Sequence, residues 1–247
     1  MATSTLHSVR NALRIIRTLS DQERGLGVSE LARRLDLGKS TVHRILATLC
    51  ADGFVRQTPK GAYKAGFALW ELGTQMIDRQ RLIDVAHDEL VSLYAQLRTP
   101  IVLSVLDGLD ALAIHRVPPA SAAVERIRPH RAPAIMVASG QVILAFCPSS
   151  ECDRVMKVEL TYGRSARVVR GFREEILSVV RRRGYAQTTD ASTSSTLAVP
   201  VFDAEGTVVG AISCIELTSR DDDAWRTIIE ALTAAANEVS RTGGDVI

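Results

Sequence analysis

Apolar and polar positions follow a helical period in a segment that starts near Lys39. The apolar positions recur at i, i+3, i+4 and i+7, which predicts one buried helix face. This face consists of Val42, Ile45, Leu46 and Leu49. The residues of the opposite face are small, polar or basic, with no acid among them: Ser40, His43, Arg44, Ala47 and Thr48.

Shorter patterns on both sides of this helix predict a winged helix-turn-helix. A short helix precedes it, and residues 36–38 (Asp-Leu-Gly) form a tight turn between the two. The buried side of that short helix consists of Leu31, Ala32 and Leu35. Residues 54–56 and 62–64 are predicted strands around a Thr-Pro-Lys-Gly tip, which would be the wing.

A further helix is expected near the start of the chain, over residues 8–19. Ser8 is its predicted N-cap, because a serine hydroxyl can accept a hydrogen bond from the first helical N–H groups. Its predicted buried face consists of Val9, Ala12, Leu13, Ile16 and Leu19.

A helix with a small, basic face fits the major groove of B-DNA, which is about 12 Å wide. The expected DNA contacts on this helix are Lys39, Ser40, Thr41, His43, Arg44 and Thr48. Those on the hairpin are Arg56, Lys60 and Lys64, which would contact sugar-phosphate without reading sequence. The alternatives are that Arg44 is an ordinary surface arginine and that His43 is a bystander.

The rest of the chain predicts an α+β domain behind a helical linker. Residues 67–97 are mostly helical in pattern, and Pro100 ends this region. Beyond it, strand and helix patterns alternate. The strand candidates are residues 101–106, 111–117, 197–202 and 208–215. The helix candidates are residues 136–146, 150–157, 173–183 and 224–241.

Composition and charge narrow the possible functions. Of the 247 residues 46% are hydrophobic, which is ample for buried cores, and only 4% are aromatic, which leaves little for the base stacking of RNA or single-strand binders. Residues 1–80 hold 12 Lys and Arg against 7 Asp and Glu, and the remainder holds 18 against 21. A basic segment joined to an acidic remainder favours a DNA-binding domain attached to another domain, although ordinary surface variation gives the same balance.

Cysteines and apolar runs indicate the compartment. No apolar run approaches the roughly 18 residues that span a bilayer, and the first residues lack a signal core. No paired C-x-x-C spacing occurs among the four cysteines, so neither a zinc site nor a disulfide framework is expected. They are Cys50, Cys147, Cys152 and Cys214. We expect a cytoplasmic protein without a metal or cofactor.

The sequence shows no set of residues with the spacing of a catalytic site. His87, His115 and His130 are scattered and show no metal-ligand or triad spacing with any Cys or Ser. A run of three arginines, residues 181–183, ends a predicted helix, where positive charge favours the helix dipole. A second nucleic-acid patch is the alternative for this run.

Seven segments, in order and spacing, resemble the IclR (isocitrate lyase regulator) family of bacterial transcription regulators. They are residues 8–13, 30–35, 39–44, 63–66, 71–73, 182–186 and 198–203. The resemblance implies a winged helix-turn-helix over residues 1–66, a helical linker over 67–98 and a GAF-like α/β effector-binding domain over 99–247. It also implies dimers, often assembled into tetramers, that act at promoters.

The chain departs from the family pattern in the half that would bind an effector. The family segment Leu-His-Ala-Thr-Ala-x-Gly-Lys-Ala is here residues 134–142, which keep the Gly but have Ile135 and Gln141 in place of His and Lys. Thr196 stands where the family has a Cys, and Ile215 replaces the second Ser of a Ser-x-Ser. These changes make the site less polar, which predicts a larger, apolar or aromatic effector; the alternative is a pocket that has shrunk or closed.

The effector is expected between two strands and the start of a helix near residue 138. Backbone N–H groups at that helix start would receive an anionic oxygen. The residues expected to surround the effector are Ile135, Met136, Ala138, Ser139, Gly140, Asp190, Thr196, Ser213 and Ile215.

The leading hypothesis is a sequence-specific, ligand-responsive transcription regulator, for example a repressor, that binds double-stranded DNA. Two hypotheses from other classes stay open at this point. One makes the C-terminal half a small-molecule enzyme with an attached targeting domain. The other makes the helix-turn-helix a protein-interaction module, which predicts no salt-sensitive binding to duplex DNA.

Overall fold

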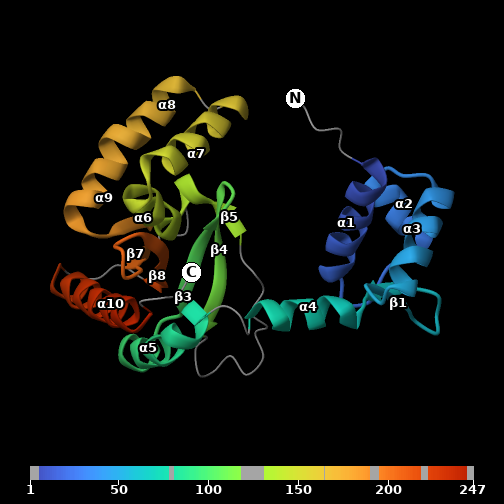
Figure 1. The fold of residues 1–247 in the computed structure, drawn as a ribbon, viewed down its shortest axis with the longest axis horizontal. Coiled ribbons are helices and arrows are strands. Elements are labelled where there is room, and N and C mark those ends of the chain that lie inside the picture. The colour runs from blue at the N-terminus through green and yellow to red at the C-terminus, as the bar shows by residue number, and fades with distance from the viewer. Residues whose placement is uncertain are drawn as a thin grey trace. The chain divides into compact units, whose positions relative to one another are not determined.

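The computed structural model describes residues 6–77, 81–117, 131–163, 165–189, 195–217 and 222–243, without the side chains of residues 215–217 and 222. The chain divides into two compact units, residues 1–79 and 80–247 (Figure 1). The division falls inside the segment that the sequence predicts as a linker. The predicted domain boundaries at residues 66 and 98 stay a prediction.

The N-terminal unit is a winged helix-turn-helix, as predicted. Three helices, α1 (His7–Ser20), α2 (Val28–Leu35) and α3 (Lys39–Ala51), precede the hairpin of β1 (Val55–Gln57) and β2 (Tyr63–Ala65). A fourth helix, α4 (Phe67–Ile77), follows directly (Figure 1). One apolar cluster joins the first three helices and the hairpin, and its buried residues include Ile15, Leu19, Leu31, Leu46 and Val55. The strands lie one residue later than predicted.

Backbone conformation explains the sharp turn between α2 and α3. Asp36 is left-handed, with φ 53°, a conformation that Asp tolerates better than most residues. The N–H of Leu37 then donates to the carbonyl of Ala32 at 3.0 Å, which satisfies an otherwise unpaired carbonyl at the end of α2. The reversal brings α3 across the end of α2, which is the helix-turn-helix geometry.

The start and the buried face of α1 differ from the prediction. The helix begins at His7 after Leu6, so Ser8 lies inside it and no side chain caps its N-terminus. Val9 and Leu13, predicted to be buried, are 52% and 54% exposed. Ile15 is fully buried instead, because α1 carries apolar residues on two sides and only one of them meets the core.

The C-terminal unit is built on a six-stranded antiparallel sheet in the order β5-β4-β3-β8-β7-β6. Four strands were predicted, and they are β3 (Ile101–Asp107), β4 (Asp110–Val117), β7 (Ser195–Phe202) and β8 (Val208–Leu217). Two short ones were missed, namely β5 (Arg131–Pro133) and β6 (Ala186–Thr189). The domain is therefore α+β, as predicted.

Helices cover both faces of this sheet (Figure 1). On one face, α5 (Arg81–Leu97) and α10 (Asp222–Thr242) pack against Leu197 and Ile212. On the other face lies α6 (Ala138–Phe146), which follows the 3-10 turn η1 (Ala134–Met136). Eight consecutive residues of α6 are buried.

Further helices follow α6 and belong to the same apolar cluster. They are α7 (Ser149–Thr161), α8 (Ala166–Gly171), the π-helical turn η2 (Phe172–Leu177) and α9 (Ser178–Arg183). The prediction had a single helix over residues 173–183 and did not include α8. Among the described residues no helix is long and apolar enough to cross a membrane.

Two histidines that the sequence left scattered lie side by side in this unit. His87 of α5 and His115 of β4 are joined by a hydrogen bond between Nδ1 and Nε2 of 3.0 Å. Burial, and secondarily the nearby His87, lowers the pKa of His115 below its usual value near 6.5. Only one of the two facing nitrogens can carry a proton in this hydrogen bond, so protonation of both nitrogens would break it.

The His115 pair predicts a loss of stability in acid. The folded state favours a neutral His115, so the unfolded chain binds its proton first as the pH falls below about 6.5, and the free energy of unfolding drops. We expect the urea midpoint of His115→Gln to fall less between pH 7 and pH 5 than that of the parent. His7→Gln, which removes an exposed histidine of α1, is the matched control. Equal pH dependence in the parent and in His115→Gln would contradict this role.

Candidate nucleic-acid interface and effector site

Packing of α3 decides which of its residues can reach a ligand. Val42, Leu46 and Leu49 are buried in the core of the unit. All six residues predicted to contact DNA on this helix are exposed: Lys39, Ser40, Thr41, His43, Arg44 and Thr48. The helix contains no Asp or Glu. Its outer face is therefore positive and narrow, as a helix in a major groove must be.

The two cations of this face have no acidic partner among the residues that the structure describes. Among the described residues no ion pair involves Lys39 or Arg44. The nearby acid Glu30 of α2 is instead held by Arg33 and Arg34, each at 2.7 Å. Hydrogen bonds from these two arginines lower the pKa of Glu30, so it stays ionised, and its negative charge is balanced by Arg33 and Arg34 within α2.

The wing offers a second set of basic residues. Arg56 of β1 pairs across the hairpin with Lys64 of β2. Lys60 is exposed at the tip, where the N–H of Gly61 donates to the carbonyl of Thr58 at 2.9 Å and Gly61 is left-handed with φ 80°. Lys64 is half-buried. The wing thus exposes both Arg56 and Lys60, and the position of Lys60 at the tip suits contact with a phosphate backbone.

Arg56 has a contact that the sequence did not indicate. Its guanidinium carbon lies 5.7 Å from the ring centroid of Phe67, the first residue of α4. A cation over an aromatic face at this distance is an attractive arrangement. The side chain of Arg56 is therefore oriented by α4.

The residues predicted to surround an effector come from several elements. Ala138, Ser139 and Gly140 form the first turn of α6, whose N-cap, Val137, provides no side-chain hydrogen bond. Gly140 packs so closely on η1 that an added Cβ would lie 2.2 Å from the carbonyl oxygen of Ala134.

Ser213 and Thr196 lie on the strands beneath that turn. Alternation along β8 puts Ser213 on the face that α6 covers, where it is buried and donates to the carbonyl of Val102 at 3.4 Å. Thr196 of β7 is half-buried. Asp190 lies outside the described residues, as does the side chain of Ile215.

Ile135 and Met136 line a separate hollow of about 720 Å³. Its other walls come from α7, α8 and η2, and they include Met156, Val168 and Phe172. Neither Ala138 to Gly140 nor Ser213 lines this hollow. The predicted residues are therefore not brought together in it.

Gln141 was noted in the sequence only as a replacement for a lysine. Its side chain is buried, and Nε2 donates to the carbonyl of Ile135 at 3.2 Å. This bond ties the second turn of α6 to η1, so Gln141 stabilises the start of the helix.

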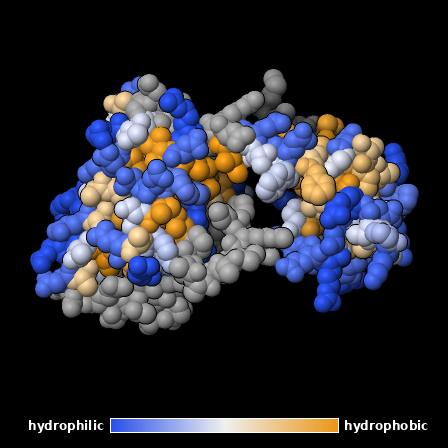
Figure 2. Space-filling model, turned by 90° about the horizontal axis from the view of Figure 1, so that it is seen from below, coloured by the Kyte–Doolittle hydropathy of each residue, from blue (hydrophilic) through white to orange (hydrophobic). Residues whose placement is uncertain are grey.

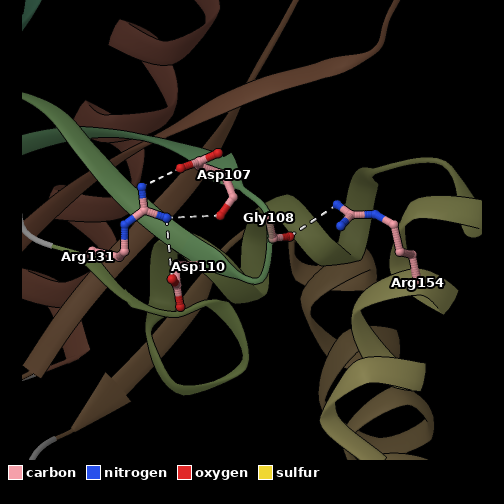
Figure 3. A network of polar contacts seen from close by, with 5 residues as sticks. All are labelled: Asp107, Gly108, Asp110, Arg131 and Arg154. Carbon is pink, nitrogen blue, oxygen red and sulfur yellow. Dashed lines mark hydrogen bonds and ion pairs between the residues drawn. The ribbon is translucent and has the colours of Figure 1, made fainter. Parts of the chain in front are cut away.

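A polar network fastens the turn between β3 and β4 to its neighbours (Figure 3). Arg131 of β5 pairs with Asp107 and, at 3.4 Å, with Asp110. Arg154 of α7 donates to the carbonyl of Gly108 at 3.1 Å. The hydrogen bond to Asp107 raises the pKa of Arg131. The network borders a hollow of about 700 Å³. Arg131 lines this hollow, but its guanidinium is already paired with two carboxylates.

The described residues offer little for catalysis. They contain no group of three or more His, Cys, Asp or Glu side chains that could hold a metal ion. Burial raises the pKa of the Cys147 thiol to about 11, with smaller contributions from Cys152 and Glu151. Burial also raises the pKa values of Cys50 and Cys152. These thiols are protonated at neutral pH, and a protonated thiol is a weak nucleophile.

Models of two protein families match the chain. The IclR helix-turn-helix domain matches residues 8–59, and the bacterial transcriptional regulator IclR C-terminal domain matches residues 74–241. The chain belongs to the IclR family. It is a DNA-binding transcription regulator with an effector-binding C-terminal domain, and this family is not one of enzymes.

Individual relatives support the same assignment over nearly the whole chain. The glycerol operon regulatory protein of Streptomyces griseus is 32% identical over 249 residues, which cover 97% of each protein. The regulator XynR of Escherichia coli (strain K12) is 29% identical over 226 residues, which cover 89% of each.

Solved structures of IclR proteins share the fold. IclR of Thermotoga maritima has a TM-score of 0.72 at 25% identity, covering 97% of this chain and 100% of that one. An IclR homologue of Microbacterium hydrocarbonoxydans, solved with 4-hydroxybenzoate, has a TM-score of 0.77 at 22% identity, covering 95% and 98%.

Substitutions on α3 and the wing are predicted to affect DNA binding in different ways. Arg44→Ala should cost about 1–3 kcal/mol if Arg44 bonds a base edge, and specificity should relax at one base pair. Lys60→Ala should weaken binding to all sequences alike and flatten the salt slope by about one unit. Fluorescence anisotropy at several salt concentrations measures both, with Arg226→Ala of α10 as an exposed-arginine control. Parent-like binding by both variants would show that these surfaces do not meet DNA.

Proposed function

We propose that the protein binds a near-palindromic operator as a homodimer, alone or paired into a tetramer, and that a small apolar or aromatic acid changes its affinity for DNA. The outward, acid-free face of α3 carries this proposal. A single such helix reads only a few base pairs, so a second copy is needed for a long, specific site. We place this action in the bacterial cytoplasm, where operators lie.

Exposed apolar residues of the N-terminal unit support a dimer. None of the residues of α4 is buried, although several of them are large and apolar. Trp70, Met76 and Ile77 are 73%, 66% and 51% exposed. Leu6, which precedes α1, and Val9 and Leu13 of α1 are likewise more than half exposed. Figure 2 shows such apolar side chains at the surface of this unit, at the right of the view. Covering apolar surface gains about 25 cal/mol per Å², and a second copy brings an identical surface.

The dimer predicts the behaviour of a charged α4. Trp70→Asp should shift the protein toward monomer, because a carboxylate would be buried without a partner at the contact. Sedimentation velocity at micromolar concentration measures the change, and Tyr162→Asp, at an equally exposed aromatic residue of the other unit, is the control. A parent that is monomeric and still binds its operator fully would contradict the dimer.

An aromatic acid is the effector class that the residues favour. The Microbacterium homologue was solved with 4-hydroxybenzoate, an acid of this kind. In this chain the first turn of α6 has N–H groups for a carboxylate, and Thr196 has a hydroxyl on the strands beneath. The Ser213 hydroxyl donates to Val102 and can still accept a hydrogen bond, such as that of a phenolic O–H. Binding there changes DNA affinity only if it favours one dimer geometry, a coupling typically of about 1–3 kcal/mol.

Calorimetric titration tests the effector class and its place. We expect 4-hydroxybenzoate or a related aromatic acid to bind more tightly than a two- or three-carbon acid. Ser213→Ala should weaken binding by about threefold to tenfold, the loss of one hydrogen bond. Val168→Ala, in the hollow beside η2, should change nothing. Tight binding of a small acid with aromatic acids inert would overturn the class, and sensitivity to Val168 instead of Ser213 would overturn the place.

A further inference from the structure

The end of α3 and the start of α4 are joined backbone to backbone. The N–H of Gly66 donates to the carbonyl of Phe54 at 2.8 Å, and the N–H of Ala68 donates to the carbonyl of Gly53 at 3.3 Å. Gly53 is left-handed, with φ 75°, and directly follows the C-cap of α3. These bonds connect the turn after α3 to the first residues of α4.

No side chain fits between the two backbones at this point. A Cβ added to Gly66 would lie 2.0 Å from the carbonyl oxygen of Gly53 and 2.8 Å from the carbonyl carbon of Phe54. Neither neighbour is a flexible side chain that could move away. The contact therefore fixes the distance between the two chain segments.

The stack of Arg56 on Phe67 adds a contact between the wing and the first residue of α4. The guanidinium lies 5.7 Å from the centroid of a ring that is itself 77% exposed. Because no residue of α4 is buried, these contacts at its first turn are what sets its direction relative to α3.

We propose that this joint, made by Gly53, Gly66 and the Arg56–Phe67 stack, determines which spacing between operator half-sites the dimer accepts. Gly66 and Phe67 are then specificity-determining residues that act through the position of α3 and not by contact with DNA. The inference rests on the proposed function, in which α4 takes part in the dimer and α3 reads DNA.

Lever length explains why a small change at the joint matters. The 11 residues of α4 span about 16 Å at 1.5 Å per residue. A tilt of about 10° at one end moves the other end by about 3 Å, close to the 3.4 Å rise of one base pair. A joint that holds its angle can therefore distinguish spacings that differ by one base pair, and a loose joint cannot.

The test compares full-length variants on duplexes of different spacing. An operator is first selected with the parent protein, and duplexes with one base pair added or removed between its half-sites are made. We expect the parent to discriminate by about tenfold or more, and Phe67→Ala to reduce this ratio to about threefold or less. Phe67→Trp keeps an aromatic face for Arg56 and should retain the ratio, whereas Phe67→Leu should not.

The measured quantity is the ratio of the affinities for the selected and the altered spacing. A variant that only binds all duplexes more weakly leaves this ratio unchanged, so the ratio separates the proposed role from a general loss of DNA binding. Gly66→Ala should reduce the ratio as well, and where its melting curve shows that it has unfolded, the Phe67 series decides alone. Tyr162→Ala removes an equally exposed aromatic side chain from the other unit and should leave the ratio at the parent value.

Each remaining outcome is decisive. An unchanged ratio in Phe67→Ala overturns the proposal, as does an equal loss of affinity at every spacing, which would make Phe67 only a dimer contact. A parent that binds no palindromic duplex would overturn the proposed function itself, a result distinct from failure of the joint.

Discussion

Burial of one side of α3 is the constraint on which the DNA-binding unit depends. Val42, Leu46 and Leu49 fill the space between α1, α2 and the hairpin, and their burial turns the polar and basic side outward. Truncation of a buried leucine costs about 2–5 kcal/mol, a large part of the 5–15 kcal/mol that stabilises a typical domain. The recognition surface is thus held by the core behind it and needs no ion pair of its own.

The same physical rule, an apolar side that must be covered, acts differently on α1 and α4. Ile15 and Leu19 are covered by the unit itself, whereas Val9, Leu13 and Trp70 are left in water. In the C-terminal unit α6 is covered on all sides, by the sheet and by the helices that follow it. This difference indicates where the chain is complete by itself and where a second copy would complete it.

Sequence patterns predicted the elements with the strongest local signals. The face of α3 has a clear helical period, the wing is marked by its Thr-Pro-Lys-Gly tip, and the four longer strands of the larger sheet are runs rich in apolar residues between helices on both faces. Strands β5 and β6 were missed because three or four residues at a sheet edge are too few to show a period. The buried face of α1 was partly wrong because a pattern cannot distinguish an apolar side that meets the core of the unit from one that stays exposed.

Contacts between distant residues of the candidate site could not be predicted. Arg56 was predicted to reach DNA, and its stack on Phe67 depends on the angle at which α4 leaves the hairpin. His87 and His115 are 28 residues apart and meet only because α5 packs against β4. Ile135 and Met136 line one hollow together with Met156, Val168 and Phe172, a grouping of distant residues that no sequence pattern shows.

Selection of binding sites from a random pool of duplexes by the full-length protein tests the central claim most directly. The outward face of α3, repeated in a dimer, predicts enrichment of one near-palindromic sequence. Its half-site centres should lie about 34 Å apart, roughly ten base pairs, or a multiple of that distance. Enrichment of a single motif without its inverted partner, or of no motif at all, would contradict the account.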